Sequence, residues 1–111
     1  MVNVEQIAGI AMTVITYSGV AKSCYVEAMR KIKSGNKEEF EAEMKKGDEN
    51  FVLAHHAHLE ILNREMTTAE PQITMLLAHA EDQLMSAETI KTIVIEMESI
   101  IEEVRGKNKD E

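Results

Sequence analysis

Two short breaks divide a chain that otherwise carries a helical pattern of apolar residues, and they constrain its fold most. The first break is SGNKEE at 34–39, and the second is TTAEPQIT at 67–74, which holds the only proline. Gly35 suits a helix C-terminus, Asn36 with Glu39 matches a capping box, and Thr74 suits an N-cap. The sequence therefore predicts three helices, at about 4–34, 37–66 and 75–104.

The predicted helices carry apolar residues at helical spacing. The first has a core row of Ile7, Ala11, Val14, Ser18, Ala21, Tyr25, Ala28 and Ile32. A second row beside it is Ala8, Met12, Ile15, Gly19, Val26 and Met29. Two rows make a wider apolar face than a lone bundle helix needs, so we expect this helix to be covered on two sides. The second helix has a predicted core row of Phe40, Met44, Phe51, Leu59 and Leu62. Gly47 and Asp48 weaken this pattern in the middle, where the helix could tolerate a bend.

Composition and loop length favour an all-α fold. Aromatic residues make up 4% of the chain, which has 5 glycines, and helix-forming residues are plentiful. Short connections place neighbouring helices antiparallel, so we expect an up-down-up antiparallel three-helix bundle. The chain of 111 residues should form one domain at 1–105, followed by a flexible tail at 106–111.

Charge and residue usage exclude several kinds of partner. The net charge is −8 without a basic stripe, so neither nucleic acid nor an anionic membrane surface is an expected partner. No apolar run approaches the roughly 18 to 20 residues of a membrane span, and we expect no membrane insertion. Cys24 is the single cysteine and the N-terminus lacks signal-peptide features, so we expect a soluble protein in the cytoplasm.

The segment MLLAHAEDQLM at 75–85 holds the candidate functional residues. His79 lies three residues before Asp82 and four before Gln83, so the three project from neighbouring positions of one helix. Asp82 falls in the row Met75, Ala78, Asp82, Met85 and Thr89. A carboxylate among methionines should not face open water, and it must then be paired, protonated or bound to a metal. A core polar pair without chemical function is the simpler alternative.

Other chemical groups give weaker signals. His55 and His58 are one turn apart, but a closed zinc site needs about four ligands, so surface or core-edge histidines are the better interpretation, also for His56. The Glu-x-x-His signature of di-iron bundles is absent. Cys24 has no histidine or basic partner close in sequence other than Lys22, and it is expected to be a small buried hydrophobe. His79 is thus the best candidate for covalent chemistry.

Three segments at matching separations resemble the lactose/cellobiose family of enzyme IIA components of the sugar phosphotransferase system. ITMLLAHAEDQLM resembles the family's LL-x-HAQDHLM helix. SGVAKSCYVEAM is similar to its AG-x-AR-S-x-x-x-EA, and AHHAHLEIL stands in place of AH-x-AQT-x-LI. The resemblance covers most of the chain.

This resemblance implies a homotrimer of three-helix subunits. His79 would match the phosphorylated histidine, taking a phosphoryl group from phosphorylated HPr and passing it to the IIB component during disaccharide uptake. The sugar, whether lactose, cellobiose or chitobiose, stays open. Asp82 would match the aspartate that meets its copies around a cation, with one Mg²⁺ per trimer shared by Asp82 of three subunits.

Three positions depart from the family pattern, and two other interpretations remain. Glu81 replaces a Gln, Gln83 a His, and Lys22 an Arg. Glu81 would lie about 200° around the helix from His79, while Gln83 can reach an imidazole at i+4. The alternatives are a non-catalytic helical oligomer or adaptor, and a metal-binding regulator that uses His55, His58 and His79.

Overall fold

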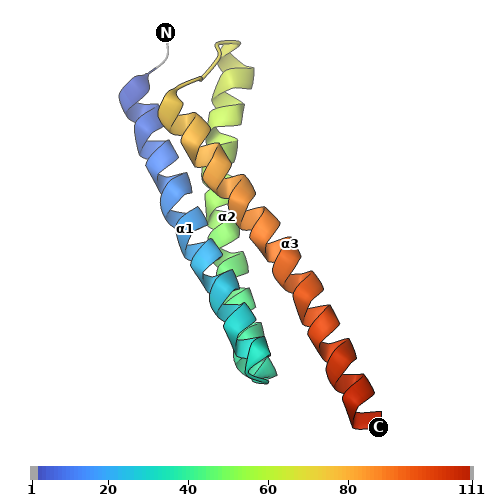
Figure 1. Cartoon of the computed structure of the whole chain (residues 1–111). Coiled ribbons are helices and arrows are strands. Elements are labelled where there is room, and N and C mark those ends of the chain that lie inside the picture. Colours follow the sequence, from blue (N-terminus) through green and yellow to red (C-terminus); the bar gives the residue numbers. More distant parts are fainter. Residues whose placement is uncertain (1–2, 111) are drawn as a thin grey trace.

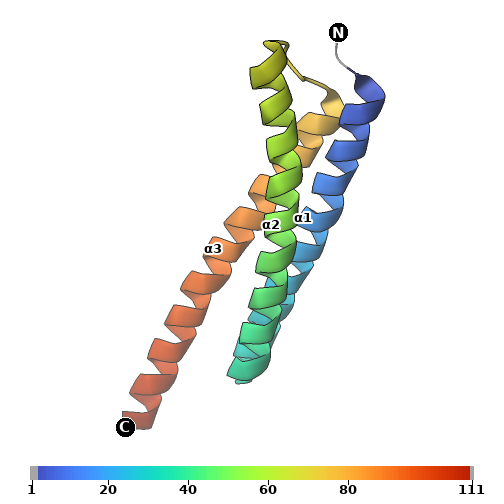
Figure 2. The same cartoon turned by 180° about the vertical axis from the view of Figure 1, so that it is seen from behind.

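The computed structural model describes residues 3–110 as three long helices joined by two short connections (Figure 1). Helix α1 spans Val4–Lys33, α2 spans Lys37–Thr68 and α3 spans Met75–Asp110. Helices α1 and α3 run in one direction and α2 in the other, as both views show (Figures 1 and 2). The predicted all-α, up-down-up bundle is confirmed.

The helix ends carry the predicted caps. Asn36 Oδ1 accepts a hydrogen bond of 3.0 Å from the Glu39 amide, and Thr74 Oγ1 accepts one of 3.0 Å from the Leu77 amide. Gly35 has a φ of 87°, in the left-handed region where a side chain is disfavoured. These contacts satisfy amides that a helix N-terminus leaves free, and they fix both connections.

Helix α1 is the central element. It packs against both other helices, whereas α2 and α3 make few contacts with each other. Its predicted core row is fully or almost fully buried: Ile7, Ala11, Val14, Ser18, Ala21, Tyr25, Ala28 and Ile32. Ala54 and Ala57 of α2 and Ala80 of α3 belong to one core cluster with Ala11 and Val14 of this row, and Ala87 is fully buried as well. Small side chains at these points let the helices approach closely.

The core row of α2 differs from the predicted one in its second half. Leu59 and Leu62 are 37% and 39% exposed, while Ala54, Ala57 and Ile61 are buried. Small alanines continue the row that starts at Phe40, and the two larger leucines lie to one side of it. The prediction that Leu59 and Leu62 belong to the core was therefore wrong.

Helix α2 is continuous through Gly47 and Asp48, the point at which the sequence pattern is weakest. A Cβ at Gly47 would lie 2.6 Å from Tyr25 Cε1, so glycine makes room for that ring. Tyr25 Oη donates a 2.7 Å hydrogen bond to Asp48 Oδ1, and Lys91 Nζ lies 2.9 Å from the same oxygen. Asp48 thus connects all three helices. Burial, and then the Asp48 hydrogen bond, raise the pKa of Tyr25 well above its ordinary value.

Helix α3 continues to Asp110 instead of ending near residue 104. Arg105 donates a 2.9 Å hydrogen bond to the Lys33 carbonyl, at the C-terminus of α1, and Lys37 pairs with Glu102 at 2.9 Å. These contacts hold α3 beside the first connection. Residues 106–110 are therefore helical rather than the expected flexible tail, and residue 111 lies outside the described residues.

Among the described residues, one helix, α1, is long and apolar enough to cross a membrane by length and composition, contrary to the expectation from the sequence. Its two apolar rows produce this result. A core helix passes the same test, and α1 is the central helix of the bundle. Only 33% of the most apolar 18-residue window of α1 is buried within the chain. Much of its second apolar row, which we call the outer row of α1, therefore lies on the surface of the single chain.

Candidate functional site

Helix α3 presents its polar residues on different sides of its buried row. Leu77, Ala80, Leu84 and Ala87 are buried against the other helices. Successive residues are about 100° apart on a helix. His79 and Gln83 therefore lie on one flank of the buried row, Glu81 on the other flank, and Asp82 on the outer face.

His79 is exposed one turn after the start of α3. The neighbouring Ala80 is fully buried, so backbone packing anchors this turn while the imidazole stays accessible. A neutral imidazole has an unprotonated ring nitrogen and can act as a nucleophile near neutral pH. The turn can therefore present a nucleophile to a partner protein.

The row that contains Asp82 lies on the surface of the single chain. Asp82, Ala78 and Thr89 are exposed. Met75 is 86% exposed and Met85 64% exposed. The expectation that Asp82 is shielded was wrong for one subunit, because Ala80 and Leu84 take the core positions. The result is an exposed apolar stripe interrupted by one carboxylate.

Gln83 contacts a lysine of α1. Lys22 Nζ donates a 3.1 Å hydrogen bond to Gln83 Oε1, and both side chains are partly buried. Two of the three departures from the family pattern, Lys22 and Gln83, therefore contact each other. Sequence reasoning had paired Gln83 with His79, because residues 61 positions apart cannot be matched by helical spacing.

Glu81 contacts a histidine of α2. His58 Nε2 lies 3.0 Å from Glu81 Oε1, with the His58 side chain 17% exposed and that of Glu81 45% exposed. Glu81 thus turns away from His79, as its position on the helix predicts. His58 is the expected core-edge histidine, and His55 and His56 are exposed.

The structure does not support a metal site made by one chain. Within residues 3–107, whose side chains are described, no three His, Cys, Asp or Glu side chains lie close enough to hold a metal ion. His55, His58 and His79 are therefore not a ligand cluster. A metal at Asp82 would need ligands from further copies of the chain.

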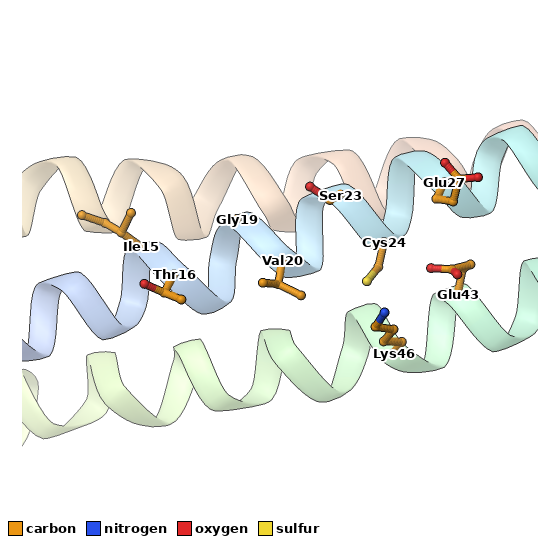
Figure 3. Close-up of a pocket in the computed structure, with 9 residues that line it drawn as sticks. All are labelled: Ile15, Thr16, Gly19, Val20, Ser23, Cys24, Glu27, Glu43 and Lys46. Atoms are coloured by element: carbon orange, nitrogen blue, oxygen red, sulfur yellow. The ribbon is translucent and has the colours of Figure 1, made fainter.

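An open groove of about 740 Å³ lies between α1 and α2 (Figure 3). Gly19 and Val20 form part of its wall on α1, and Glu43 and Lys46 line it from α2. Cys24 borders the groove but is only 5% exposed. Burial raises the pKa of its thiol, which disfavours the reactive thiolate. This supports the interpretation of Cys24 as a small buried hydrophobe.

Comparisons with known proteins agree on one family. Residues 9–102 match the model described as PTS system, Lactose/Cellobiose specific IIA subunit. The chain is 35% identical to the oligo-beta-mannoside-specific EIIA component of Bacillus subtilis, over 79% of this chain and 80% of the relative. It is 32% identical to the lichenan-specific phosphotransferase enzyme IIA component of the same species, over 92% of this chain and 96% of the relative.

A solved structure is also similar over nearly its whole length. It is the PTS cellobiose-specific enzyme IIA from Bacillus anthracis, with a TM-score of 0.84 and 33% sequence identity. The match covers 96% of this chain and 95% of the other. The agreement therefore extends through all three helices.

Proposed function

Because the chain belongs to the lactose/cellobiose-specific IIA family of the sugar phosphotransferase system, we propose that His79 is the residue on which it carries a phosphoryl group. The chain is a phosphocarrier of sugar uptake, and the family is one of phosphotransferase components. The observation that carries the assignment to His79 is its exposure on an anchored turn of α3, within the segment that resembles the family's histidine helix.

The transfer needs a nucleophile and an accessible approach more than a deep pocket. The lone pair of one His79 ring nitrogen forms a new N–P bond as the N–P bond of the donor histidine breaks. The bonding electron pair returns to the donor ring. Phosphoryl transfer depends chiefly on in-line positioning and on stabilising the charge of the moving group. A small helical protein can therefore carry the group while its partners supply much of the remaining site.

The family gives the transfer its partners. We propose phosphorylated HPr as the donor and the IIB component as the acceptor, both meeting His79 at the exposed flank of α3. The relatives are named for oligo-β-mannoside, lichenan, cellobiose and lactose uptake, so we propose a disaccharide of the cellobiose, lactose or chitobiose type. We place the chain in the cytoplasm, where the transfer from HPr occurs.

We further propose that the chain forms a homotrimer around Mg²⁺ held by Asp82 of three subunits. The exposed stripe of Met75, Asp82 and Met85, together with the open outer row of α1, supports this assembly. Three carboxylates brought together would repel one another, and a hard divalent cation with oxygen ligands offsets that repulsion. The cation would supply charge neutralisation and hold the subunits together.

Intact mass after incubation with phosphorylated HPr tests the assignment to His79. We expect wild type to gain one acid-labile phosphate and His79→Gln to gain none, because an amide offers no nucleophile. The matched controls His55→Gln, His56→Gln and His58→Gln should all gain it. Labelling that persists in His79→Gln and disappears in one of the controls would move the site to that histidine. An absence of labelling in wild type would favour the non-catalytic oligomer.

A further inference from the structure

We propose that the first turns of α1 form the docking face for phosphorylated HPr, the protein that delivers the phosphoryl group to His79. The docking face consists of Val4, Ala8 and Met12, on the side of α1 next to His79. Val4 is 63% exposed and Met12 is 50% exposed. The proposal rests on the function proposed above, in which His79 accepts the phosphoryl group, and it adds the surface that the donor protein contacts.

The packing of α1 against α3 sets the height of the docking face. The two helices run in the same direction (Figure 1). Two core clusters each hold a pair of residues from these helices that are 70 positions apart, namely Ile7 with Leu77 and Val14 with Leu84. At the same offset, Ala8 lies level with Ala78 and Met12 lies level with Asp82. The height of His79 therefore falls between Ala8 and Met12.

The contact between Lys22 and Gln83 shows which side of α1 faces the flank of His79. Gln83 lies on the same flank of α3 as His79, and Lys22 Nζ donates a 3.1 Å hydrogen bond to its side chain. A step of seven residues turns a helix by only about 20°, and two such steps lead from Lys22 back to Ala8. Ala8 is therefore the residue of α1 beside His79, and Met12 lies one turn farther along, closer to the solvent.

A protein that reaches the imidazole of His79 must also cover the docking face. Even a small transient interface of about 500 Å² on one partner extends roughly 13 Å from its centre. The axes of packed helices are about 8–10 Å apart, and one turn adds about 5 Å along the helix. Ala8 and Met12 therefore lie within the area that a donor covers when it approaches His79 on this flank.

The chemistry of the docking face suits a phosphorylated partner. The chain has a net charge of −8, yet α1 carries no charged residue between Glu5 and Lys22. An uncharged surface does not repel an incoming phosphoryl group. The exposed side chain of Met12 is flexible and apolar, and such side chains supply the buried centre of a protein interface. Ala8 has only a methyl group, which leaves space beside the imidazole.

The same argument divides the outer row of α1 between two partners. Ala8 and Met12 are level with His79, and the donor needs access there. Gly19 and Val26 lie roughly 16 and 27 Å farther along the helix than Ala8. These later turns are left for the proposed contact between copies of the chain. Docking of the donor is therefore compatible with the homotrimer.

The test compares Met12→Asp with Val52→Asp on the full chain. Both residues are apolar and 50% exposed, and Val52 lies on α2, outside the docking face. Rapid-quench measurements of phosphate uptake give the half-saturating concentration of phosphorylated HPr and the maximal rate. We expect Met12→Asp to raise the half-saturating concentration on the order of tenfold, because it places a charge in an apolar contact. Val52→Asp should stay within about twofold of wild type.

A small phosphodonor separates docking from the reactivity of His79. Phosphoramidate needs no protein surface: its P–N bond breaks and ammonia leaves as the bond from phosphorus to the His79 ring forms. We expect Met12→Asp to be labelled by phosphoramidate as fast as wild type.

Val4→Asp gives a second test of the docking face. It places a carboxylate in the first turn of α1, where the helix dipole favours negative charge, so the fold is not at risk. We expect the same pattern as for Met12→Asp, with uptake from phosphorylated HPr impaired and labelling by phosphoramidate unchanged. Val4→Asp decides the question if Met12→Asp does not fold.

The outcomes distinguish the docking face from the proposed function. Half-saturating concentrations for Met12→Asp and Val4→Asp equal to that of Val52→Asp overturn the docking face and leave His79 in place. A loss of assembly in sedimentation, with uptake from phosphorylated HPr unchanged, assigns the face to a second copy instead. Impairment confined to onward transfer to the IIB component assigns it to that protein, and either result overturns the proposal. A wild-type chain that phosphorylated HPr does not label overturns the proposed function and the docking face with it.

Discussion

Gly47→Ala should destabilise the fold, although alanine normally stabilises a helix. The added Cβ would lie 2.6 Å from Tyr25 Cε1 and 2.8 Å from Tyr25 Cδ1. Real Cβ atoms do not approach a ring carbon so closely, so either the ring or the helix must move. The ring is fully buried and its hydroxyl is bonded to Asp48, which leaves it little freedom to turn.

The expected size follows from two opposing effects. Replacing a helical glycine by alanine stabilises a helix by about 0.5–1 kcal/mol. Overpacking a tight core costs about 1–3 kcal/mol. Complete loss of the hydrogen bond from Tyr25 to the Asp48 carboxylate would cost about 1.5–3 kcal/mol, and weakening it would cost less. We therefore expect Gly47→Ala to lower the free energy of unfolding by about 1–3 kcal/mol. Gly9→Ala is the matched control, since nothing lies within 4 Å of its added Cβ.

Urea unfolding at one fixed chain concentration measures both variants, because any assembly makes stability depend on concentration. Gly9→Ala should equal or exceed wild type. In a Tyr25→Leu background, where the ring is gone, Gly47→Ala should become neutral or stabilising. A Gly47→Ala chain as stable as wild type would refute the reasoning, as would an equal loss with and without the Tyr25 ring.

Three further predictions concern assembly, pH and the Glu81 position. In sedimentation experiments, a metal chelator should dissociate the wild-type trimer. The Asp82→Leu chain should assemble without metal, because apolar packing replaces buried like charges. A wild-type trimer that does not respond to the chelator would show that Asp82 does not hold a metal. Stability should fall as pH rises above about 10, because the unfolded tyrosine loses its proton there while burial raises the pKa of Tyr25 in the fold. Tyr25→Phe should show a shallower fall in urea midpoint, and an identical slope would contradict this. Glu81→Gln should change the rate of phosphate uptake by His79 less than about threefold, since its carboxylate contacts His58 instead, and a large acceleration would place Glu81 beside the phosphoryl group.

The sequence predicted those parts of the fold that local rules determine. Helix periodicity located the core row of α1, and capping chemistry located both connections at Asn36 and Thr74. The end of α3 was missed because Arg105 reaches the carbonyl of Lys33, and such a contact has no local signature. Gly47 was interpreted as a weakness in α2, although its lack of a side chain is what the Tyr25 ring requires.

The site was predictable in its residues but not in their partners. The segment around His79 indicated a nucleophile, and helical spacing correctly placed Glu81 away from it. Spacing could not show that Gln83 meets Lys22 or that Glu81 meets His58, because each pair joins different helices. The exposure of Asp82 was also missed, since a stripe for another subunit and a core stripe follow the same period of 3.6 residues.

The three departures from the family pattern gain a common explanation from these contacts. Gln83 and Glu81 lie on opposite flanks of the buried row of α3, and each contacts another helix: Gln83 contacts Lys22 of α1, and Glu81 contacts His58 of α2. The negative charge of Glu81 is drawn to α2, on the flank opposite His79. The positive charge of Lys22 is held on the flank of His79 by a neutral amide. An anionic group that arrives at His79 is therefore spared the repulsion of the Glu81 carboxylate, which lies on the other flank of α3.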